Sequence, residues 1–536
     1  MKHQDEIYDV AIVGFGPVGA TAANLLGSMG FKTIVIEKEY EIYDKPRAIT
    51  FDQEIMRIFQ WVQLTDDILP CTTRYRPAHY LGMNGQIIRR IDPAPAPFPL
   101  YWLPNYLFDQ PMLEATLRTG ASRYINNTIR LGENLVSIQT TGNNVKLLTE
   151  ELATKTIKSI NADYVWACDG ASSTVRKKLN IELEDLDFSE QWLVIDTNVK
   201  DTSALPNVNI QYCEPSRPST YVIGPQNHRR WEMMLMPGET KEYISSKSKI
   251  QELLQRWGSP SNFDIRRAAV YNFRALVAKE WRKNRIFLLG DAAHQTPPFM
   301  GQGMCQGIRD AANLAWKLRE IKRFGGTETI LDSYENERKP HAIKLTNFTK
   351  ELGKTICMTD PIEAAKRDVQ MKAELDSGKM VTVRQDMIPS LTSGFINLSP
   401  AGTPIGPAGR ICFQPVVRNQ SDEEKPMDEF TNNGFLIVTV DKELIRNMSP
   451  NVIKWFRSFG GQCIVLDSTT TVPIQGARVL KETNGVLSNF LRNWNCNFLV
   501  VRPDKYIYGG GNKLDDIIEM LRAIQLSFDP KNSFHF

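Results

Sequence analysis

The chain has few residues of the types that bind structural metals or form disulfides. Its 536 residues include eight cysteines and six histidines. No two cysteines form a Cys-x-x-Cys pair, and the histidines form no His-Glu-x-x-His motif. A zinc site and a disulfide framework are therefore not expected. Scattered single cysteines are typical of reduced, mostly buried thiols, which predicts a cytoplasmic protein.

The chain also lacks an excess of charge of either sign. Its 64 Lys and Arg residues nearly balance 61 Asp and Glu residues, for a formal net charge of +3. Without a clustered basic face, neither a nucleic acid nor a membrane is an expected partner. The one long uncharged run, residues 10–31, holds five glycines and Pro17 and follows acidic residues. It is therefore interpreted as part of a soluble domain rather than as a membrane helix.

This uncharged run is typical of a nucleotide-binding crossover. Residues 8–13 and 33–37 favour strands, and residues 20–29 between them favour a helix. The connection carries Gly14-x-Gly16-x-x-Gly19. These glycines allow a tight turn, the approach of a pyrophosphate to the helix start, and close packing of helix and strand. Glu37 ends the second strand, where its carboxylate can accept hydrogen bonds from an adenosine ribose. The pattern fits FAD or NAD without choosing between them.

Two further motifs follow predicted strands, and together the three carry a family resemblance. Residues 169–176, Asp-Gly-Ala-Ser-Ser-Thr-Val-Arg, follow a strand at 163–167, and residues 290–294, Gly-Asp-Ala-Ala-His, follow a strand at 285–289. With these motifs in order, the whole chain resembles the class A FAD-dependent aromatic hydroxylases, the para-hydroxybenzoate hydroxylase superfamily. Residues 297–305 and the pattern Tyr334-Glu335-x-x-Arg338-x-Pro340 are most similar to its 3-(3-hydroxyphenyl)propionate hydroxylase group.

The resemblance implies a set of FAD-binding residues. Asp291 would accept a hydrogen bond from the ribityl chain, and the helix predicted from about Cys305 would direct its N-terminal amides at the flavin pyrimidine edge. Asp169 and Arg176 would also contact the reduced nicotinamide; their alternative interpretation is a capped turn with a surface ion pair. His294 is assigned to a turn, and no catalytic base is identified. The predicted cofactor-binding residues are Gly14, Gly16, Gly19, Glu37, Arg47, Gln110, Asp169, Gly290, Asp291, Gly301, Gly303 and Met304.

The resemblance also implies an α/β fold with several domains. A Rossmann-like FAD-binding domain is expected at 1–184 and 281–350, interrupted by a mostly antiparallel β-sheet substrate domain at 185–280. The proline-rich residues 80–105 are expected to run over the surface. A helical linker is expected at 351–404 and a thioredoxin-like domain at 405–536. Because that domain has no Cys-x-x-Cys, a structural or dimer-contact role is expected for it, and a homodimer stays open.

The implied activity is that of a single-component monooxygenase. FAD would stay bound, while NADH or NADPH would visit transiently, because no second glycine-rich fingerprint follows the first. Oxygen would be transferred from O₂ to a phenolic ring through a flavin C4a-hydroperoxide. The substrate would be similar to 3-(3-hydroxyphenyl)propionate. The alternatives are the same chemistry on a polyketide, quinolone or other heteroaromatic ring, or a non-catalytic flavin-binding scaffold.

The substrate pocket is expected between the flavin and the sheet of residues 185–275. An acidic phenol also needs an anchor, for which Arg217 and the cluster 228–230 (His-Arg-Arg) are candidates. An exposed basic turn is the preferred interpretation of that cluster. The candidate substrate residues are Trp192, Tyr212, Tyr221, Met234 and Pro298.

Overall fold

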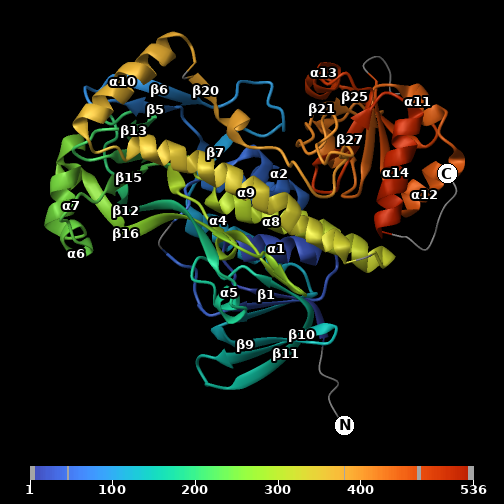
Figure 1. Cartoon of the computed structure of the whole chain (residues 1–536), viewed down its shortest axis with the longest axis horizontal. Helices are drawn as coiled ribbons and strands as arrows, with labels where there is room; N and C mark the ends of the chain where they lie inside the picture. Colours follow the sequence, from blue (N-terminus) through green and yellow to red (C-terminus); the bar gives the residue numbers. More distant parts are fainter. Residues whose placement is uncertain (1–6, 45–46, 327, 380, 468–472, 529–536) are drawn as a thin grey trace. The chain divides into compact units, whose positions relative to one another are not determined.

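The computed structural model describes residues 7–44, 47–326, 328–379, 381–467 and 473–528. The chain has a mixed α/β fold with several sheets and divides into two compact units. Unit 1 contains Met1–Ala94, Pro104–Ile308 and Ala342–Ile388, and unit 2 contains Pro95–Leu103, Arg309–His341 and Pro389–Phe536. The elements of both are labelled in Figure 1.

Unit 1 contains the predicted nucleotide-binding sheet. Its strands are β1 (Ile7–Val13), β2 (Thr33–Glu37), β8 (Asn127–Leu131), β9 (Glu133–Thr141), β10 (Asn144–Glu151), β11 (Ile157–Ala167), β17 (Arg282–Lys283) and β18 (Ile286–Leu288). β18, β11, β1, β2 and β8 pair in parallel, in that order. The predicted crossover is confirmed, with helix α1 (Pro17–Ser28) between β1 and β2. The helix starts earlier than expected because proline is favoured in the first turn.

The register of this sheet brings the three motifs to one edge. Val13 of β1 is level with Ile36 of β2 and Ala167 of β11, and Ala167 is level with Leu288 of β18. The parallel strands therefore end together, and the loop that carries each motif leaves the sheet at the same side. In open parallel sheets this carboxyl edge is where ligands bind.

A second sheet of unit 1 has nine strands in the order β19-β16-β12-β15-β14-β13-β5-β6-β20. They are β5 (Ala78–Leu81), β6 (Ile87–Asp92), β12 (Leu183–Val199), β13 (Asn209–Tyr212), β14 (Ser219–Ile223), β15 (His228–Met234), β16 (Phe263–Ala278), β19 (His294–Gln295) and β20 (Val381–Val383). The predicted antiparallel pairing is confirmed from β13 to β16. The predicted surface run at 80–105 was wrong for β5 and β6. Ile88 and Ile91 are buried, and the prolines begin only after the strand.

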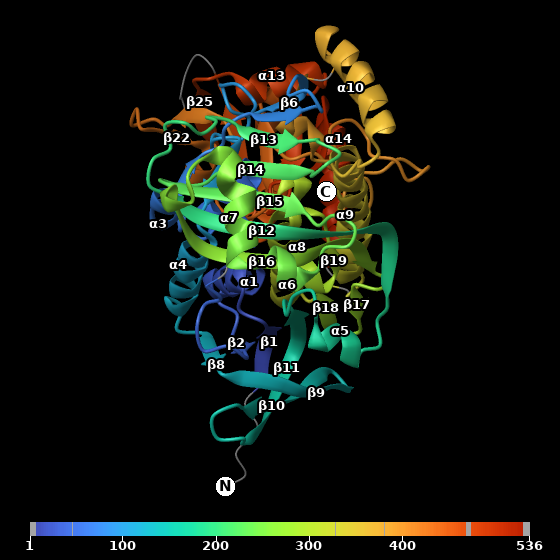
Figure 2. The ribbon, with the colours of Figure 1, turned by 90° about the vertical axis from the view of Figure 1, so that its left-hand side faces the viewer.

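The two faces of this second sheet have different surroundings because side chains alternate along a strand. Leu193 and Ile195 of β12 pack under helices α6 (Lys241–Ile244) and α7 (Lys247–Leu254), which lie in front of the sheet in Figure 2. Trp192 points the other way and packs with Phe299 and with Leu345 of α9. We call the face of Trp192 the inner face and that of α7 the outer face.

The helices and smaller elements of unit 1 support the motif loops. The helix predicted from about Cys305 is α8, which begins at Gly303, and α10, capped by Asp360, lies within the expected helical linker. These elements are α2 (Gln53–Trp61), α4 (Gln110–Ser122), α5 (Thr174–Lys178), α8 (Gly303–Phe324), α9 (Thr329–Ile356) and α10 (Pro361–Asp376), with the small sheet of β3 (Thr50–Asp52), β4 (Thr72–Arg74) and β7 (Asn105–Phe108). Residues 309–324 of α8 and residues 329–341 of α9 belong to unit 2.

Unit 2 contains a seven-stranded sheet in the order β22-β21-β25-β24-β23-β26-β27. Its elements are β21 (Val416–Arg418), β22 (Glu424–Pro426), β23 (Leu436–Thr439), β24 (Gln462–Leu466), β25 (Ala477–Glu482), β26 (Phe498–Val501), β27 (Ile507–Gly511), α11 (Lys442–Arg446), α12 (Pro450–Ser458), α13 (Val486–Asn493) and α14 (Leu514–Phe528). They are coloured orange to red in Figure 1.

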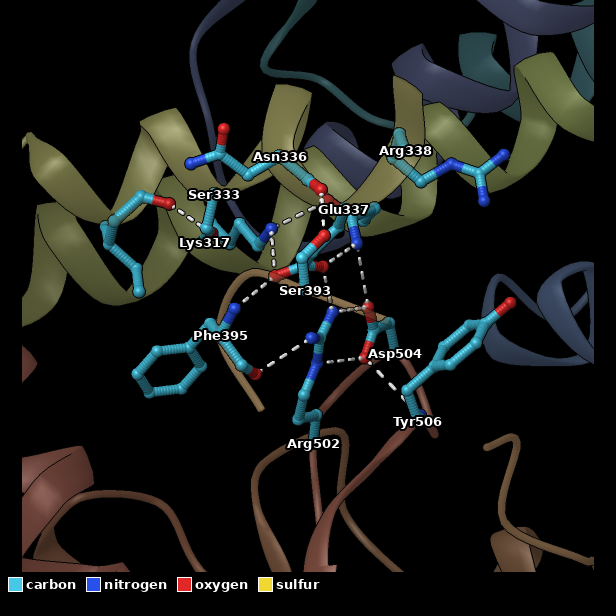
Figure 3. Close-up of polar contacts among 12 residues, drawn as sticks. Lys317, Ser333, Asn336, Glu337, Arg338, Ser393, Phe395, Arg502, Asp504 and Tyr506 are labelled. Carbon is cyan, nitrogen blue, oxygen red and sulfur yellow. Dashed lines mark hydrogen bonds and ion pairs between the residues drawn. The ribbon is translucent and has the colours of Figure 1, made fainter. Parts of the chain in front are cut away.

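A buried ionic network joins distant segments within unit 2 (Figure 3). Arg502 Nη2 lies 2.8 Å from Glu337 Oε2 and 2.6 Å from Asp504 Oδ2. Lys317 Nζ lies 3.0 Å from the other oxygen of Glu337. The four side chains are at most 2% exposed, and their two positive and two negative charges balance. We call these four residues the ionic network.

Candidate functional site

The glycine fingerprint packs directly against the end of β11. Gly14 has a φ of +98°, and a Cβ atom there would overlap the carbonyl oxygen of Cys168. A Cβ on Gly19 would overlap the Gly14 carbonyl. A Cβ on Gly16 would meet no atom within 4 Å, so this side of the loop is open at the start of α1. Free helix N-terminal amides beside an open glycine form a suitable cradle for a pyrophosphate.

Glu37 is fixed beside the fingerprint at the end of β2. Its Oε2 accepts a hydrogen bond of 2.7 Å from the Phe15 amide, and its Oε1 accepts one of 2.9 Å from the Glu39 amide. Each carboxylate oxygen has more than one lone pair, so both can accept a further bond. The position suits the predicted ribose contact.

The Asp169 motif forms a capped turn that is tied to the Gly290 motif. Asp169 accepts hydrogen bonds from the Ser173 hydroxyl (2.5 Å) and from the Val175 amide (3.0 Å). Arg176 is buried and donates to the carbonyl oxygens of Ala171 and Ala292, each at 2.9 Å. The capped turn was foreseen as one interpretation, but Arg176 is a clamp between the two motifs rather than part of a surface ion pair.

The Gly290 motif closes the site against two helices. Gly290 has a φ of +60°, and a Cβ there would lie 3.0 Å from Val18 of α1. Gly307 of α8 approaches so closely that its Cβ would lie 2.8 Å from the Gly290 Cα. α8 and the loop after β18 therefore meet backbone to backbone, and the Val18 side chain of α1 packs against both glycines. Sequence reasoning missed Gly307, although an isolated glycine inside a predicted helix is a signal of close packing.

Asp291 occupies the centre of this arrangement with an unused carboxylate. No hydrogen bond to its carboxylate is found among the described residues. Burial raises its pKa, against the opposing charges of His294 and Arg47. A half-buried acceptor without a donor among the described residues fits a ligand that supplies a hydroxyl group, such as the FAD ribityl chain. His294 lies in the following turn with its ring 5.0 Å from that of Trp281.

We expect Asp291→Asn to weaken FAD binding roughly 10- to 100-fold, because a charge-assisted hydrogen bond becomes a neutral one. The dissociation constant is measured by titrating the FAD-free protein and following flavin fluorescence. Asp187→Asn is the control: Asp187 is exposed and has a φ of +59°, which asparagine tolerates. Equal FAD affinity in both variants would contradict the role of Asp291.

Gln110 positions the segment that contains Arg47. Its Oε1 accepts hydrogen bonds from the amides of Arg47 (2.8 Å) and Ala48 (2.7 Å). Residues 45–46 lie outside the described residues. The segment continues to Thr50, whose side chain would be overlapped by a Cβ on Gly301. Residues 47–50 are therefore held between the start of α4 and the loop before α8.

The loop before α8 places an exposed helix start on the same side. Gly301 has a φ of +60°, and a Cβ on Gly303 would meet no atom within 4 Å. Gln302 is buried and donates to Asp52 at 3.2 Å, while Met304 is partly exposed. The predicted FAD contacts of Gly301, Gly303 and Met304 therefore come from one loop next to Thr50.

The structure separates the five candidate substrate residues into two groups. Trp192 and Met234 lie on the inner face, where the Trp192 ring is 5.6 Å from that of Phe299, the neighbour of Pro298. Tyr212 and Tyr221 lie on the outer face. The Tyr212 hydroxyl accepts from Trp257 and the Tyr221 hydroxyl donates to Pro206, each at 3.2 Å. Only the first group can belong to a pocket on the inner face.

The candidate anchors are already engaged. Arg217 forms two hydrogen bonds to Glu239, of 2.6 and 2.9 Å. The prediction of an exposed basic turn at 228–230 was wrong, because His228 and Arg230 are buried against Asp196. Arg230 Nε donates to Asp196 Oδ1 at 2.7 Å, and His228 Nε2 lies 3.1 Å from the same atom.

The described residues also bear on metal binding, membrane spanning and disulfide bonds. No cluster of three or more His, Cys, Asp or Glu side chains has the geometry of a metal site there. No helix in that part of the chain combines the length and the hydropathy that a membrane span requires. All eight cysteines are free thiols.

Comparison with protein families gives two matches along the chain. The family described as "FAD binding domain" matches residues 7–349, and the family described as "HcaD C-terminal domain" matches residues 409–524. The first match spans all three motifs. The second match lies entirely within unit 2.

Curated relatives are similar over nearly the full length. A probable NADH-specific resorcinol 4-hydroxylase of Rhodococcus jostii is 33% identical over 94% of this chain and 91% of the relative. A 3-(3-hydroxy-phenyl)propionate/3-hydroxycinnamic acid hydroxylase of Klebsiella pneumoniae is 33% identical over 93% of this chain and 91% of the relative.

Solved structures share the fold at low identity. The flavin-dependent monooxygenase PieE, in complex with FAD and substrate, superposes with a TM-score of 0.80 at 16% identity, covering 98% of this chain and 99% of that one. Aklavinone-11 hydroxylase, in complex with FAD and aklavinone, has a TM-score of 0.77 at 18% identity, covering 97% and 99%.

Proposed function

The chain belongs to the FAD binding domain family and, within it, to the class A FAD-dependent aromatic hydroxylases, and on this basis we propose that it hydroxylates a small phenolic ring. It is an FAD-dependent enzyme that uses a reduced nicotinamide cofactor and O₂. The observation that carries the proposal is the convergence of three motif loops at one sheet edge, in a chain that matches phenol hydroxylases from end to end.

The residues at this edge fit FAD. The open side of Gly16 at the start of α1 would take the pyrophosphate, Glu37 the adenosine ribose, and Asp291 the ribityl chain. The amides at the start of α8 would face the pyrimidine edge, where a helix N-terminus stabilises negative charge. When bound, FAD supplies the redox chemistry, accepting hydride from the nicotinamide and activating O₂.

We propose the inner face of the nine-stranded sheet as the substrate side. Trp192, Met234 and Phe299, which belong to one buried apolar cluster there, would provide apolar walls that exclude water and fix the plane of an aromatic ring. Phe188 packs edge-on against Phe299, with ring centres 5.9 Å apart. A phenol brings its own electron donor, the ring hydroxyl, so we assign no catalytic base.

We propose that NADH is the reductant, because the Rhodococcus relative is described as NADH-specific. The reduced cofactor would bind transiently, since the chain has one glycine fingerprint and that one would hold FAD. We also retain the cytoplasm as the compartment, because all eight cysteines are free thiols.

For residues 405–536 we propose a thioredoxin-like domain with a structural role. Its central strands β23, β24 and β25 are parallel, β26 is antiparallel to β23, and β27 is antiparallel to β26. Burial raises the pKa of the Cys463 thiol to about 12, so this cysteine is a poor nucleophile. Disulfide exchange is therefore not part of the proposal.

The function is tested by a substrate panel. We expect phenols such as 3-(3-hydroxyphenyl)propionate, 3-hydroxycinnamate or resorcinol to accelerate NADH oxidation by the holoenzyme and to yield an equal amount of hydroxylated product. NADH oxidation is followed by absorbance and the product by mass spectrometry. Product only from polycyclic or heteroaromatic compounds would overturn the phenol assignment. No accelerated oxidation with any ring compound would favour the flavin-binding scaffold instead.

A further inference from the structure

A buried arginine on the inner face has no hydrogen-bond acceptor among the described residues. The side chain of Arg267, on β16, is 3% exposed. Its Nε, Nη1 and Nη2 atoms are all buried, and none donates a hydrogen bond to a described residue. Its nearest carboxylate, that of Asp196, lies 3.8 Å from Nη1. A buried guanidinium with five unused donors is costly unless something else accepts from it.

The charges around Arg267 do not provide that acceptor. Asp196 is shared with His228 and Arg230, and both of its oxygens already accept from Arg230. Glu232 also faces this cluster from β15, where its Oε1 lies 3.6 Å from Arg230 Nη1, and burial raises its pKa. Desolvation lowers the pKa of Arg267 to about 10, so it stays protonated at neutral pH. Neither carboxylate therefore accepts a hydrogen bond from Arg267.

The guanidinium lies next to the apolar part of the proposed pocket. Its central carbon is 4.8 Å from the ring centre of Tyr271, on the same strand. Tyr271 pairs directly with Trp192 in the sheet, so the two rings share the inner face. The Tyr271 hydroxyl is also buried and donates to no described residue. Arg267 and Tyr271 thus present unused donors beside an aromatic wall.

We propose that Arg267 and the Tyr271 hydroxyl form an anion subsite that holds the carboxylate of an aromatic acid substrate. This inference rests on the proposed function and narrows its substrate to phenols with an acidic side chain. The planar guanidinium can donate two parallel bonds to a carboxylate, and the aromatic ring of the same molecule would contact Trp192. The diphosphate of the nicotinamide cofactor is the other anion that could bind here, so the test separates the two.

The test compares an acid with its neutral counterpart on the purified holoenzyme. 3-(3-Hydroxyphenyl)propionate and its primary amide are each titrated against the oxidised protein, and flavin absorbance reports binding without turnover. Wild type should prefer the acid. Arg267→Met should weaken binding of the acid roughly 10- to 100-fold and leave the amide unchanged within about twofold. Arg267→Lys should keep part of the preference for the acid over the amide. Tyr271→Phe should reduce this preference by less than Arg267→Met does.

Arg256→Met is the matched control. Arg256 is on the outer side of the same sheet region, half exposed and paired with Glu214 at 2.7 Å, so its loss should not change the preference. FAD content verifies that each variant is folded. Equal weakening of acid and amide in Arg267→Met would overturn the subsite. A raised KM for NADH in Arg267→Met, with unchanged binding of the acid, would also overturn the subsite. In that case the anion that Arg267 binds would be the nicotinamide diphosphate. If wild type binds the acid through Arg267 but forms no hydroxylated product, the subsite stands and the proposed reaction fails.

Discussion

The Gly14→Ala variant is expected to contain no FAD after purification. The substitution places a Cβ atom on the carbonyl oxygen of Cys168, which is main chain at the end of a central strand and cannot turn aside. The φ of +98° adds backbone strain for any residue with a side chain. The loop must therefore leave β11, and the cradle at the start of α1 is lost with it. The measurement is the flavin-to-protein ratio of the purified protein and its FAD affinity in titration.

Two further glycine variants distinguish the effect of the Cβ overlap from the effect of the backbone strain. Gly142→Ala has the same kind of strain, at a φ of +58°, but its Cβ meets no atom within 4 Å, so full FAD content is expected. Gly16→Ala also meets no protein atom, but it fills the proposed pyrophosphate cradle, so it should fold normally and bind FAD weakly. Full FAD content in Gly14→Ala would contradict the packing argument.

Glu337→Ala is expected to destabilise unit 2 by about 3–5 kcal/mol, because it leaves a buried lysine and a buried arginine without their shared carboxylate. Glu337 is fully buried, and opposite charges hold its pKa at about 2 despite the burial. Stability is measured by urea unfolding, with tryptophan fluorescence and circular dichroism as separate probes because two units need not unfold together.

Two further variants make this prediction specific to the ionic network. Glu335→Ala is on the same helix but removes a partly exposed pair with Lys339, at 3.4 Å, so a loss below about 1 kcal/mol is expected. Adding Lys317→Met to Glu337→Ala removes a stranded positive charge and should restore part of the stability. A Glu337→Ala protein as stable as Glu335→Ala would show that the network contributes little.

The nucleotide-binding half could be predicted from sequence because its signals are local. The strands buried on both faces, such as Thr33–Glu37, appear as short apolar runs, and the motifs sit in the turns that follow them. Even there the contacts of Arg176 and Gly307 escaped prediction. Both depend on which loops meet at the sheet edge, and that follows from the strand order rather than from neighbouring residues.

The side-chain arrangement of the nine-stranded sheet could not be predicted in the same detail, because it depends on contacts between residues on different strands. Whether Trp192 and Tyr212 share a face depends on register, and a shift of one residue would reverse the answer. Arg230 looked like part of an exposed turn because its partner, Asp196, is 34 residues away on the next strand. β6 was missed because prolines follow it closely and because two consecutive arginines separate Ile88 from Ile91, so the segment shows no strict alternation. The pairing of β6 with β5 shifts register at this point, and both isoleucines are buried.

The ionic network has a consequence for how the chain is made at the ribosome. Its carboxylate at 337 and its guanidinium at 502 are separated by 165 residues of chain. At synthesis rates of roughly 5–20 residues per second, the helices emerge about 8 to 33 seconds before the arginine that completes them. During that interval Lys317 and Glu337 lack Arg502 and Asp504, and the surface on which they lie faces water. A nascent chain paused between these positions should therefore recruit chaperones, and release should come when residues 502–504 have left the exit tunnel.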